Sequence, residues 1–418
     1  MHIELLTIGD ELLLGFTIDT NAAHLARELA AVGVSMVRRA TVGDDPDAIA
    51  SGVREALDRT GAVITTGGLG PTADDMTKPA IATLFGRGMR LDEPTLARHK
   101  AMWSKRFPTR PFPEPNVAQS MVPEGAELLE NRHGSAPGIW LEDERGRWVA
   151  MLPGVPREMR GMLADVLLPR VVERMGGSAT TVVRSRTIRT TGIAESALAE
   201  RLGDLARQVD GMNVASLPGV DGTDLRITAR DLTSHAADVA LDAAAAKLRE
   251  RAGSFVYGEG DVDLAALVLD ACRSRGLHIG VGESCTGGLL GARLTAVAGS
   301  SDVVLGGIIA YDNAIKQSLL GVPDELLRAH GAVSEPVAQA MAGGARASTG
   351  ADIGVGITGI AGPGGGTEAK PVGTVWIAID LAGEQRTLHS VFWGNREEVR
   401  YRAAQAALDM IRRMLAGL

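Results

Sequence analysis

A serine at the end of a predicted strand carries the clearest chemistry in this sequence. Ser284 follows the apolar run 277–281 and precedes Thr286-Gly287-Gly288, which opens a predicted helix. A hydroxyl in this position lies in the field of a helix N-terminus, where backbone N–H groups can stabilise an oxyanion. Serine becomes an effective nucleophile only when a base removes its proton. The sequence therefore predicts a nucleophile here and requires a base elsewhere in the chain.

The candidate base is a lysine. The two histidines that follow Ser284, His330 and His389, lie in no motif that reads as catalytic, whereas Lys316 follows the next predicted strand, 303–310. A lysine acts as a base near neutral pH only when it is desolvated or has a cationic neighbour. An ordinary surface lysine is the competing interpretation. Tyr311, in the same segment, could equally be a core aromatic residue with a solvated hydroxyl.

A glycine-rich loop and a pair of arginines could complete this site. Five glycines lie within the nine residues from Thr358 to Gly366, directly after a predicted strand. Such a loop lets backbone approach a phosphate or an oxyanion; a flexible linker is the alternative, although the loop lies between two strands of one apparent domain. Arg396 and Arg400 are four residues apart on the last predicted helix. They could clamp a phosphate together or pair with nearby carboxylates.

A second glycine-rich turn, 65–72, follows a predicted strand nearer the N-terminus. Its glycines and the helix after it could hold a phosphate, and Asp74 and Asp75 could hold a divalent cation that bridges phosphate oxygens. On spacing alone, the competing interpretation is a tight turn in which one of these aspartates caps the next helix. Glu11 and Asp44, at the ends of the first two predicted strands, would bring further acids to the same place.

The elements that must position these residues fall into three parts. Strands alternate with helices in 1–173 and again in 260–418, which predicts two three-layer α/β domains whose ligand sites lie at the carboxyl ends of parallel strands. Residues 178–257 predict a small α+β domain between two linkers, Gly176-Gly177-Ser178 and Tyr257-Gly258-Glu259-Gly260. The middle domain contains Gly219-Val220-Asp221-Gly222, a loose match to the G-x-x-G clamp of KH folds. This loop carries no basic residue, so nucleic-acid binding is not expected.

Composition indicates a folded, soluble, multidomain protein. The 418 residues are 45% hydrophobic and 22% charged, which excludes disorder as the dominant state. A net charge of −8 and 3% aromatic residues argue against a general nucleic-acid binder. Two cysteines exclude a disulfide framework, and no signal peptide or membrane-spanning run is evident. We therefore expect a cytoplasmic protein with no membrane partner.

Taken together, the motifs resemble the CinA (competence/damage-inducible) family over nearly the whole chain. The amino-terminal half of that family is similar to the molybdopterin-binding fold of the MogA and MoaB proteins, the middle domain is KH-like, and the carboxy-terminal domain is an amidohydrolase. The segments that carry the resemblance are Gly9–Leu13 with Asp19–Asn21, Thr66–Thr72, Pro153–Pro156 with Glu158-Met159, Glu283–Gly288, Tyr311–Lys316, Gly356–Gly365 and Lys370–Val375.

The resemblance implies a bifunctional enzyme of pyridine-nucleotide salvage. In the carboxy-terminal domain it implies deamidation of nicotinamide mononucleotide without a cofactor, with Ser284 as nucleophile, Lys316 as base, and Tyr311 and Thr358 in support. Substrate would be bound by the following residues: Thr286, Gly287, Gly288, Gly359, Gly362, Gly364, Gly366, Arg396 and Arg400.

In the amino-terminal domain the resemblance implies cleavage of ADP-ribose with a divalent metal (Mg, Mn or Co). The diphosphate would contact Gly67, Gly68, Gly70, Thr72 and Asn21, and the metal would contact Glu11, Asp44, Asp74 and Asp75. Two alternatives remain: the amino-terminal domain only binds a pterin or nucleotide, or the chain is an interaction protein of competence and recombination. A homodimer is expected.

Overall fold

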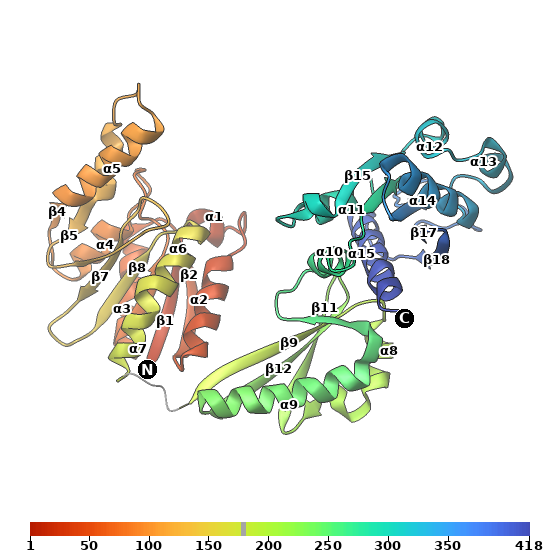
Figure 1. The fold of residues 1–418 in the computed structure, drawn as a ribbon. Coiled ribbons are helices and arrows are strands. Elements are labelled where there is room, and N and C mark those ends of the chain that lie inside the picture. The colour runs from red at the N-terminus through yellow and green to blue at the C-terminus, as the bar shows by residue number, and fades with distance from the viewer. Residues whose placement is uncertain (177–180) are drawn as a thin grey trace. The chain divides into compact units, whose positions relative to one another are not determined.

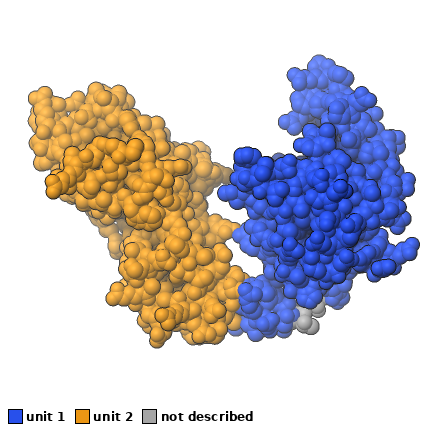
Figure 2. Space-filling model, turned by 180° about the vertical axis from the view of Figure 1, so that it is seen from behind, with its two compact units in different colours: residues 1–184, 229–239 blue, residues 185–228, 240–418 orange. Residues whose placement is uncertain are grey.

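The computed structural model describes residues 1–176 and 181–418, so two of the three residues of the first predicted linker, Gly177 and Ser178, lie outside the described residues. Contacts group the chain into two compact units, Met1–Arg184 with Ala229–Val239, and Ser185–Thr228 with Ala240–Leu418 (Figure 2). Among the described residues, no helix has the length and apolarity needed to cross a membrane.

The first unit is built on a six-stranded sheet in the order β2-β1-β3-β8-β7-β6 (Figure 1). The four strands β2, β1, β3 and β8 are parallel to their neighbours, and β7 and β6 continue the sheet antiparallel. The strands are β1 His2–Ile8, β2 Ser35–Val42, β3 Ala62–Thr66, β6 Glu127–Leu129, β7 Gly138–Glu142 and β8 Trp148–Leu152, with a separate pair β4 Met89–Leu91 and β5 Met121–Pro123.

Helices cover both faces of this sheet, as the three-layer prediction requires. On one face α2, α6 and α7 bury their apolar side chains in one core, and on the other face α3 and α4 belong to a second core. The helices are α1 Asp10–Leu13, α2 Thr20–Ala31, α3 Pro46–Thr60, α4 Thr77–Leu84, α5 Glu93–Arg106, α6 Pro156–Met162 and α7 Leu168–Arg174, with a 3₁₀ helix at Glu114–Ser120 and a π turn at Leu163–Leu167.

Local sequence explains where the first helices begin and end. Asp19 accepts a hydrogen bond from the Ala22 N–H at the start of α2, and Asp45 does the same for Ala48 at the start of α3. An N-cap carboxylate satisfies an N–H group that the first turn of a helix leaves free. Helix α3 ends at Gly61, which takes a left-handed conformation (φ 73°). These signals fix the helices that bring the strand ends together.

The middle part of the chain forms a five-stranded sheet in the order β10-β11-β12-β9-β13. Its elements are β9 Val182–Thr190, α8 Glu195–Leu202, β10 Gln208–Val209, β11 Met212–Pro218, β12 Thr223–Leu232, α9 Ser234–Ala252 and β13 Val256–Glu259, with 3₁₀ turns at Gly203–Ala206 and Gly253–Phe255. The second predicted linker, Tyr257–Gly260, was wrong. Residues Val256–Glu259 pair with β9 as the edge strand of the sheet, because an unpaired strand edge offers hydrogen-bonding groups even to a short glycine-containing segment.

The C-terminal part has a five-stranded sheet in the order β15-β14-β16-β17-β18. Strands β15, β14 and β16 are parallel, and β17 and β18 are antiparallel additions. Helices α10, α11 and α15 pack on one face, and α12, α13 and α14 on the other. The elements are α10 Leu264–Arg273, β14 Ile279–Glu283, α11 Leu289–Thr295, β15 Val304–Ile309, α12 Asn313–Leu320, α13 Asp324–His330, α14 Glu335–Thr349, β16 Ile353–Gly359, β17 Thr374–Leu381, β18 Glu384–Val391 and α15 Arg396–Leu415, with a 3₁₀ turn at Ser300–Asp302.

The central strand β16 alternates glycine with apolar residues, and the glycines lie against helix α14. A Cβ atom on Gly354 would lie 2.0 Å from the carbonyl oxygen of Ala342, and one on Gly356 would lie 2.3 Å from that of Ala338. The helix backbone therefore rests directly on the sheet, at a distance that no side chain larger than hydrogen allows. The fold class predicted from the sequence is confirmed, and this contact is one reason why the chain can adopt it.

We expect Gly356→Ala to lower the free energy of unfolding of the second unit by about 2–3 kcal/mol, because either the helix or the strand must shift to admit the methyl group. Chemical denaturation followed by circular dichroism measures the change. Gly364→Ala is the matched control, since nothing lies within 4 Å of the Cβ position at Gly364. Equal stability of the two variants would contradict the close packing of α14 on β16.

Candidate functional site

Three neighbouring strands bring the predicted residues of the second unit to one edge of the sheet. Glu283, at the end of β14, pairs with Ile309 of β15 on one side and Ile357 of β16 on the other. The next residue, Ser284, donates its backbone N–H to the carbonyl of Ile357 over 2.9 Å. Ser284, Tyr311 and Thr358 therefore all follow or end parallel strands at their shared carboxyl edge, as the sequence predicted.

Lys316 is buried beside this edge, with 1% of its surface exposed. It lies on α12, and its Nζ donates to the carbonyl oxygens of Ala310 (2.9 Å) and Tyr311 (3.2 Å). Burial lowers its pKa, although Asp312 and Cys285 act in the opposite direction. The side chain thus meets the desolvation condition for a lysine base. Among the described residues, the Nζ of Lys316 hydrogen-bonds these two carbonyl oxygens and not Ser284.

Cys285 is a second nucleophilic side chain next to Ser284, and its environment argues against a role in attack. The thiol is buried, and burial raises its pKa to about 12. A thiol with so high a pKa stays protonated near neutral pH, and the thiolate is the reactive form. The serine hydroxyl, at 8% exposure for the residue, is therefore the better candidate nucleophile.

Glu283 is the residue that the sequence argument missed. Its carboxylate, in a residue that is 1% exposed, accepts hydrogen bonds from the N–H groups of Gly288 (3.0 Å), Leu290 (3.1 Å) and Gly291 (2.8 Å) at the start of α11. These three N–H groups are therefore already paired with a buried carboxylate, so stabilisation of an oxyanion stays a prediction for the other N–H groups of the segment after Ser284. The sequence signal that could have identified Glu283 is its position directly before the serine and a predicted helix, where a carboxylate can accept hydrogen bonds from the helix N-terminus.

The two predicted arginines hold loops of the site together. Arg396 donates to the carbonyl of Gly362 (2.6 Å) and to the Tyr311 hydroxyl (2.9 Å). Arg400 donates to the carbonyl of Thr286 through Nη2 (2.7 Å) and Nε (3.2 Å). Helix α15 is thereby tied to the segment after Ser284, to the glycine-rich loop and to Tyr311. Tyr311 is 62% exposed, so it is not the core aromatic residue considered as the alternative.

The glycine-rich loop after β16 is held against a neighbouring segment. Thr358 Oγ1 donates to the carbonyl of Ala332 (2.8 Å), and Lys370 Nζ donates to those of His330 (3.0 Å) and Val333 (2.7 Å). The other predicted substrate-contacting positions are Thr286, Gly287, Gly288, Gly359, Gly362, Gly364 and Gly366, in the loops that follow β14 and β16. Among these, Thr286 Oγ1 is buried without a hydrogen-bond partner among the described residues.

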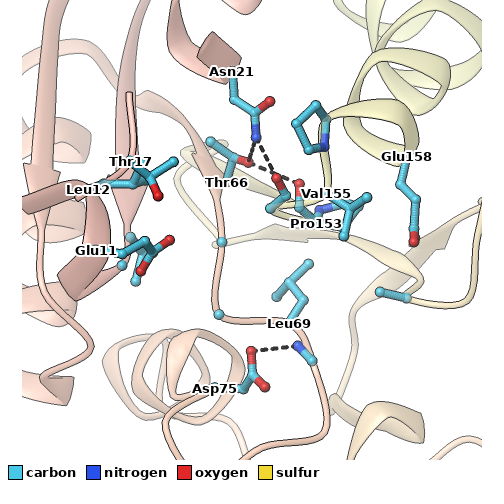
Figure 3. A pocket seen from close by; sticks show the side chains of 18 of the residues that line it. Glu11, Leu12, Thr17, Asn21, Thr66, Leu69, Asp75, Pro153, Val155 and Glu158 are labelled. Atoms are coloured by element: carbon cyan, nitrogen blue, oxygen red, sulfur yellow. Dashed lines mark hydrogen bonds between the residues drawn. The ribbon is translucent and has the colours of Figure 1, made fainter. Parts of the chain in front are cut away.

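The first unit contains a cavity of about 480 Å³ at the carboxyl edge of its parallel strands (Figure 3). The structure brings eight of the nine predicted residues into its wall: Glu11, Asn21, Asp44, Gly67, Gly68, Gly70, Asp74 and Asp75. Thr72, the ninth, lies outside the lining and hydrogen-bonds Asp75. Glu158, for which the sequence predicted no role in the site, also lines the cavity and accepts a hydrogen bond from Asn131.

Asp75 has a structural task in this loop. Its carboxylate accepts hydrogen bonds from the backbone N–H groups of Gly70 (2.7 Å) and Thr72 (2.8 Å), which closes the glycine-rich turn. Asn21 is fixed in a similar way, because its Nδ2 donates to the carbonyl of Gly154 (2.7 Å) (Figure 3). The tight turn is thus present, but the expectation that Asp74 or Asp75 caps the next helix was wrong, because α4 begins after Met76 with no hydrogen bond from a capping side chain.

Negative charge accumulates around Asp44. Burial, together with the charges of Asp10, Glu11 and Asp74, raises its pKa, while a hydrogen bond from the Asp10 N–H (2.9 Å) acts in the opposite direction. Carboxylate oxygens are the donors that hard divalent cations prefer. In the part of the chain that the structure describes, however, no three His, Cys, Asp or Glu side chains are grouped closely enough to hold a metal ion. The donor chemistry fits a cation, whereas the predicted four-acid cluster does not form.

Comparisons with known proteins assign the three parts of the chain. Residues 4–173 match the model of a probable molybdopterin binding domain, residues 185–258 that of the damage-inducible protein CinA KH domain, and residues 261–415 that of the CinA C-terminal domain.

Relatives match over the full length. A CinA-like protein of Gemmatimonas aurantiaca is 65% identical over 416 residues, which are 100% of this chain and 97% of that protein. A CinA-like protein of Salinibacter ruber is 45% identical over 100% of both chains. A putative competence-damage inducible protein of Moorella thermoacetica is 41% identical over 99% of both. The chain therefore belongs to the CinA family.

Proposed function

We propose that the protein is a hydrolase whose C-terminal domain deamidates nicotinamide mononucleotide through Ser284 and Lys316. The observation that carries this proposal is the buried, desolvated lysine at the strand edge that also presents the serine. An amide carbon needs a nucleophile and a group that moves a proton from it to the leaving nitrogen. The family membership and the resemblance noted above supply the substrate.

In the proposed reaction Lys316 carries one proton in each of two steps, the first from serine to ammonia and the second from water to serine. Neutral Lys316 accepts the proton of Ser284 Oγ as the oxygen bonds to the carboxamide carbon. The resulting ammonium returns the proton to the departing nitrogen, which leaves as ammonia when the C–N bond breaks. Water then attacks the acyl-serine ester, lysine again accepting a proton, and nicotinic acid mononucleotide leaves as serine regains its hydrogen. Lys316 must turn from its present carbonyl partners toward Ser284, a rearrangement common to sites without bound substrate.

The phosphate of this substrate would lie near the loops that α15 ties together. Arg396 is exposed and Arg400 is half-buried, and each guanidinium has five N–H groups, more than its present hydrogen bonds use. A phosphate could therefore be bound while the arginines keep their contacts with the loops. Thr286 Oγ1, which has no hydrogen-bond partner in the described part of the chain, would offer a further donor.

We expect Ser284→Ala and Lys316→Met each to lower the rate of ammonia release from nicotinamide mononucleotide by at least about 10³-fold. Each variant removes a group that the proposed reaction uses directly. Cys285→Ala is the matched control, because it removes the neighbouring thiol and leaves serine and lysine in place; it should keep most of the activity. A coupled ammonia assay measures all four proteins. Loss of activity in Cys285→Ala alone would contradict the assignment of the nucleophile.

The rate should also depend on pH in one direction. A base acts when it is deprotonated. The value of kcat/KM should therefore be low at pH values below the pKa of Lys316 and should rise as the pH passes through that pKa. Because burial lowers that pKa, the rise should lie below the ordinary lysine value of about 10.4. Measurement between pH 6 and 10 tests this expectation, with Cys285→Ala again keeping the profile. A rate that is independent of pH over this range would argue against a lysine base.

We further propose that the N-terminal domain cleaves the diphosphate of ADP-ribose with a divalent cation. The cavity that would receive a doubly negative diphosphate is lined by four acids, Glu11, Asp44, Asp74 and Asp75. Without a cation these carboxylates would repel the ligand. Because no three acids of the described residues are grouped closely enough to hold an ion by themselves, two of Glu11, Asp44 and Asp74 would hold the metal together with oxygens of the diphosphate, whose charge it would neutralise. Asp75 would keep the Gly67–Gly70 turn closed. The alternative is a cavity that binds a pterin or a nucleotide without turnover.

We expect EDTA to abolish release of AMP from ADP-ribose, and Asp44→Asn to lower it by about 10²-fold or more in the presence of Mg, Mn or Co, because one carboxylate ligand is lost. Asp47→Asn is the control: Asp47 is exposed in the first turn of α3 and does not line the cavity. Chromatography of the nucleotides measures turnover. Saturable binding of ADP-ribose without release of AMP would favour the binding-module alternative.

A further inference from the structure

The Gly219-Val220-Asp221-Gly222 segment forms the turn of a β-hairpin. It joins β11 to β12, whose residues Pro218 and Thr223 pair, and the Gly219 N–H donates to the carbonyl of Gly222 over 2.8 Å. The turn therefore opens no helix, so that no helix N-terminus attracts a phosphate here. Its one charged side chain, Asp221, is negative. The turn lacks both features that a clamp for a nucleic-acid backbone requires.

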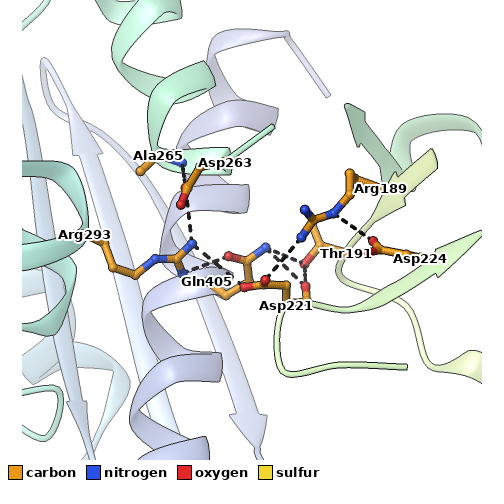
Figure 4. A network of polar contacts seen from close by, with 8 residues as sticks. All are labelled: Arg189, Thr191, Asp221, Asp224, Asp263, Ala265, Arg293 and Gln405. Carbon is orange, nitrogen blue, oxygen red and sulfur yellow. Dashed lines mark hydrogen bonds and ion pairs between the residues drawn. The ribbon is translucent and has the colours of Figure 1, made fainter. Parts of the chain in front are cut away.

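The backbone of this turn instead contacts the last helix of the chain. Gln405, on α15, is 3% exposed, and its Nε2 donates to the carbonyl of Asp221 (3.2 Å) and to Thr191 Oγ1 (3.3 Å). Thr191 Oγ1 itself donates to the same carbonyl (2.7 Å). Figure 4 shows the amide of Gln405 between the hairpin turn and Arg293. Loss of these partners would leave buried polar groups without hydrogen bonds, which costs folding free energy.

The side chain of Asp221 faces cationic groups from two directions. Arg189, on β9, lies 3.2 Å from Asp221 Oδ2, and Arg293, on α11, lies 4.0 Å from Oδ1 (Figure 4). The Arg293 side chain is 10% exposed; its Nη1 donates to Gln405 Oε1 (2.9 Å), and its guanidinium lies 4.7 Å from the centre of the Tyr401 ring. The negative turn thus meets a buried positive charge of the C-terminal part, which is the complementarity of an interface.

The shape of the turn is held from the other side by β9. A Cβ atom on Gly222 (φ +146°) would lie 2.0 Å from the carbonyl oxygen of Thr190. The glycine of the motif is therefore required for contact between two backbones within the middle domain. This contact is sufficient to explain Gly222, without a ligand that binds to the backbone of the turn.

We propose that the Gly219–Gly222 turn is the docking element by which the KH-like domain binds helices α11 and α15 of the C-terminal domain of its own chain, and that it does not bind nucleic acid. Its partner is the combined surface of Arg293, Tyr401 and Gln405. This inference does not depend on the hydrolase activities proposed above.

Hydrogen exchange of the full-length protein tests the docking. Gln405→Ala removes the amide that bridges the turn and Arg293, and Asp221→Asn removes the charge with little change of shape. In both variants we expect backbone amides of the 219–222 turn and of α11 to exchange at least about fivefold faster than in the wild type. Asp242→Asn is the control, since Asp242 lies on α9 of the same domain and pairs with Arg186 at the surface. Unchanged exchange in the folded Asp221→Asn variant would overturn the proposal.

Fluorescence anisotropy with labelled single-stranded RNA and DNA of about 20 nucleotides tests the exclusion of nucleic acid. At low salt, where phosphate contacts are strongest, we expect no saturable binding by the wild type. Saturable binding that also slows hydrogen exchange in the 219–222 turn would overturn the proposal. Binding that leaves exchange in the turn unchanged would place the nucleic acid elsewhere and support the docking assignment.

Discussion

Close approach of one backbone segment to another, at positions where only glycine fits, is the constraint on which this structure depends. In the first unit a Cβ on Gly67 would lie 2.1 Å from the carbonyl oxygen of Ile8, so the phosphate-loop candidate rests directly on β1. In the second unit Gly354 and Gly356 admit helix α14 to the sheet, and Gly222 admits the hairpin turn to β9. Sheets and loops positioned in this way bring strand ends together with little freedom to move, which a pre-organised site requires.

Around Ser284 the fold solves the problem of buried charge in two different ways. Glu283 stays compatible with burial because it accepts three hydrogen bonds from the start of α11, which offset the loss of its hydration. Lys316 has two carbonyl acceptors and, among the described residues, no hydrogen-bonded carboxylate partner, and burial lowers its pKa. One charge thus shapes the turn that presents the serine, and the other becomes easier to deprotonate. The same helix α11 continues to Arg293, so the serine segment and the docking surface of the KH-like domain share one element.

The N-terminal cavity follows a different principle, because among the described residues Glu11, Asp44 and Asp74 form no ion pair with a basic side chain. Asp10, Glu11 and Asp74 raise the pKa of Asp44, while Asp75 is occupied with the backbone of the glycine-rich turn. The two domains therefore offer opposite conditions to a nucleotide. The C-terminal edge carries Arg396 and Arg400, whereas the N-terminal cavity requires a cation before it can accept a diphosphate.

The sequence by itself determined the alternation of strands and helices in the first and last domains and the family, because periodicity, helix caps and the motifs after β1, β3, β14 and β16 are local signals. It also placed Ser284, Tyr311 and Thr358 at strand ends, and parallel topology then made them neighbours. Only the tertiary structure decided the burial of Lys316, the capture of the α11 N-terminus by Glu283, the use of Asp75 within its own turn and the pairing of Val256–Glu259 with β9. Each of these depends on which hydrogen-bond partner the fold places next to a polar group. Contacts between residues distant in sequence produce no periodic pattern in the sequence.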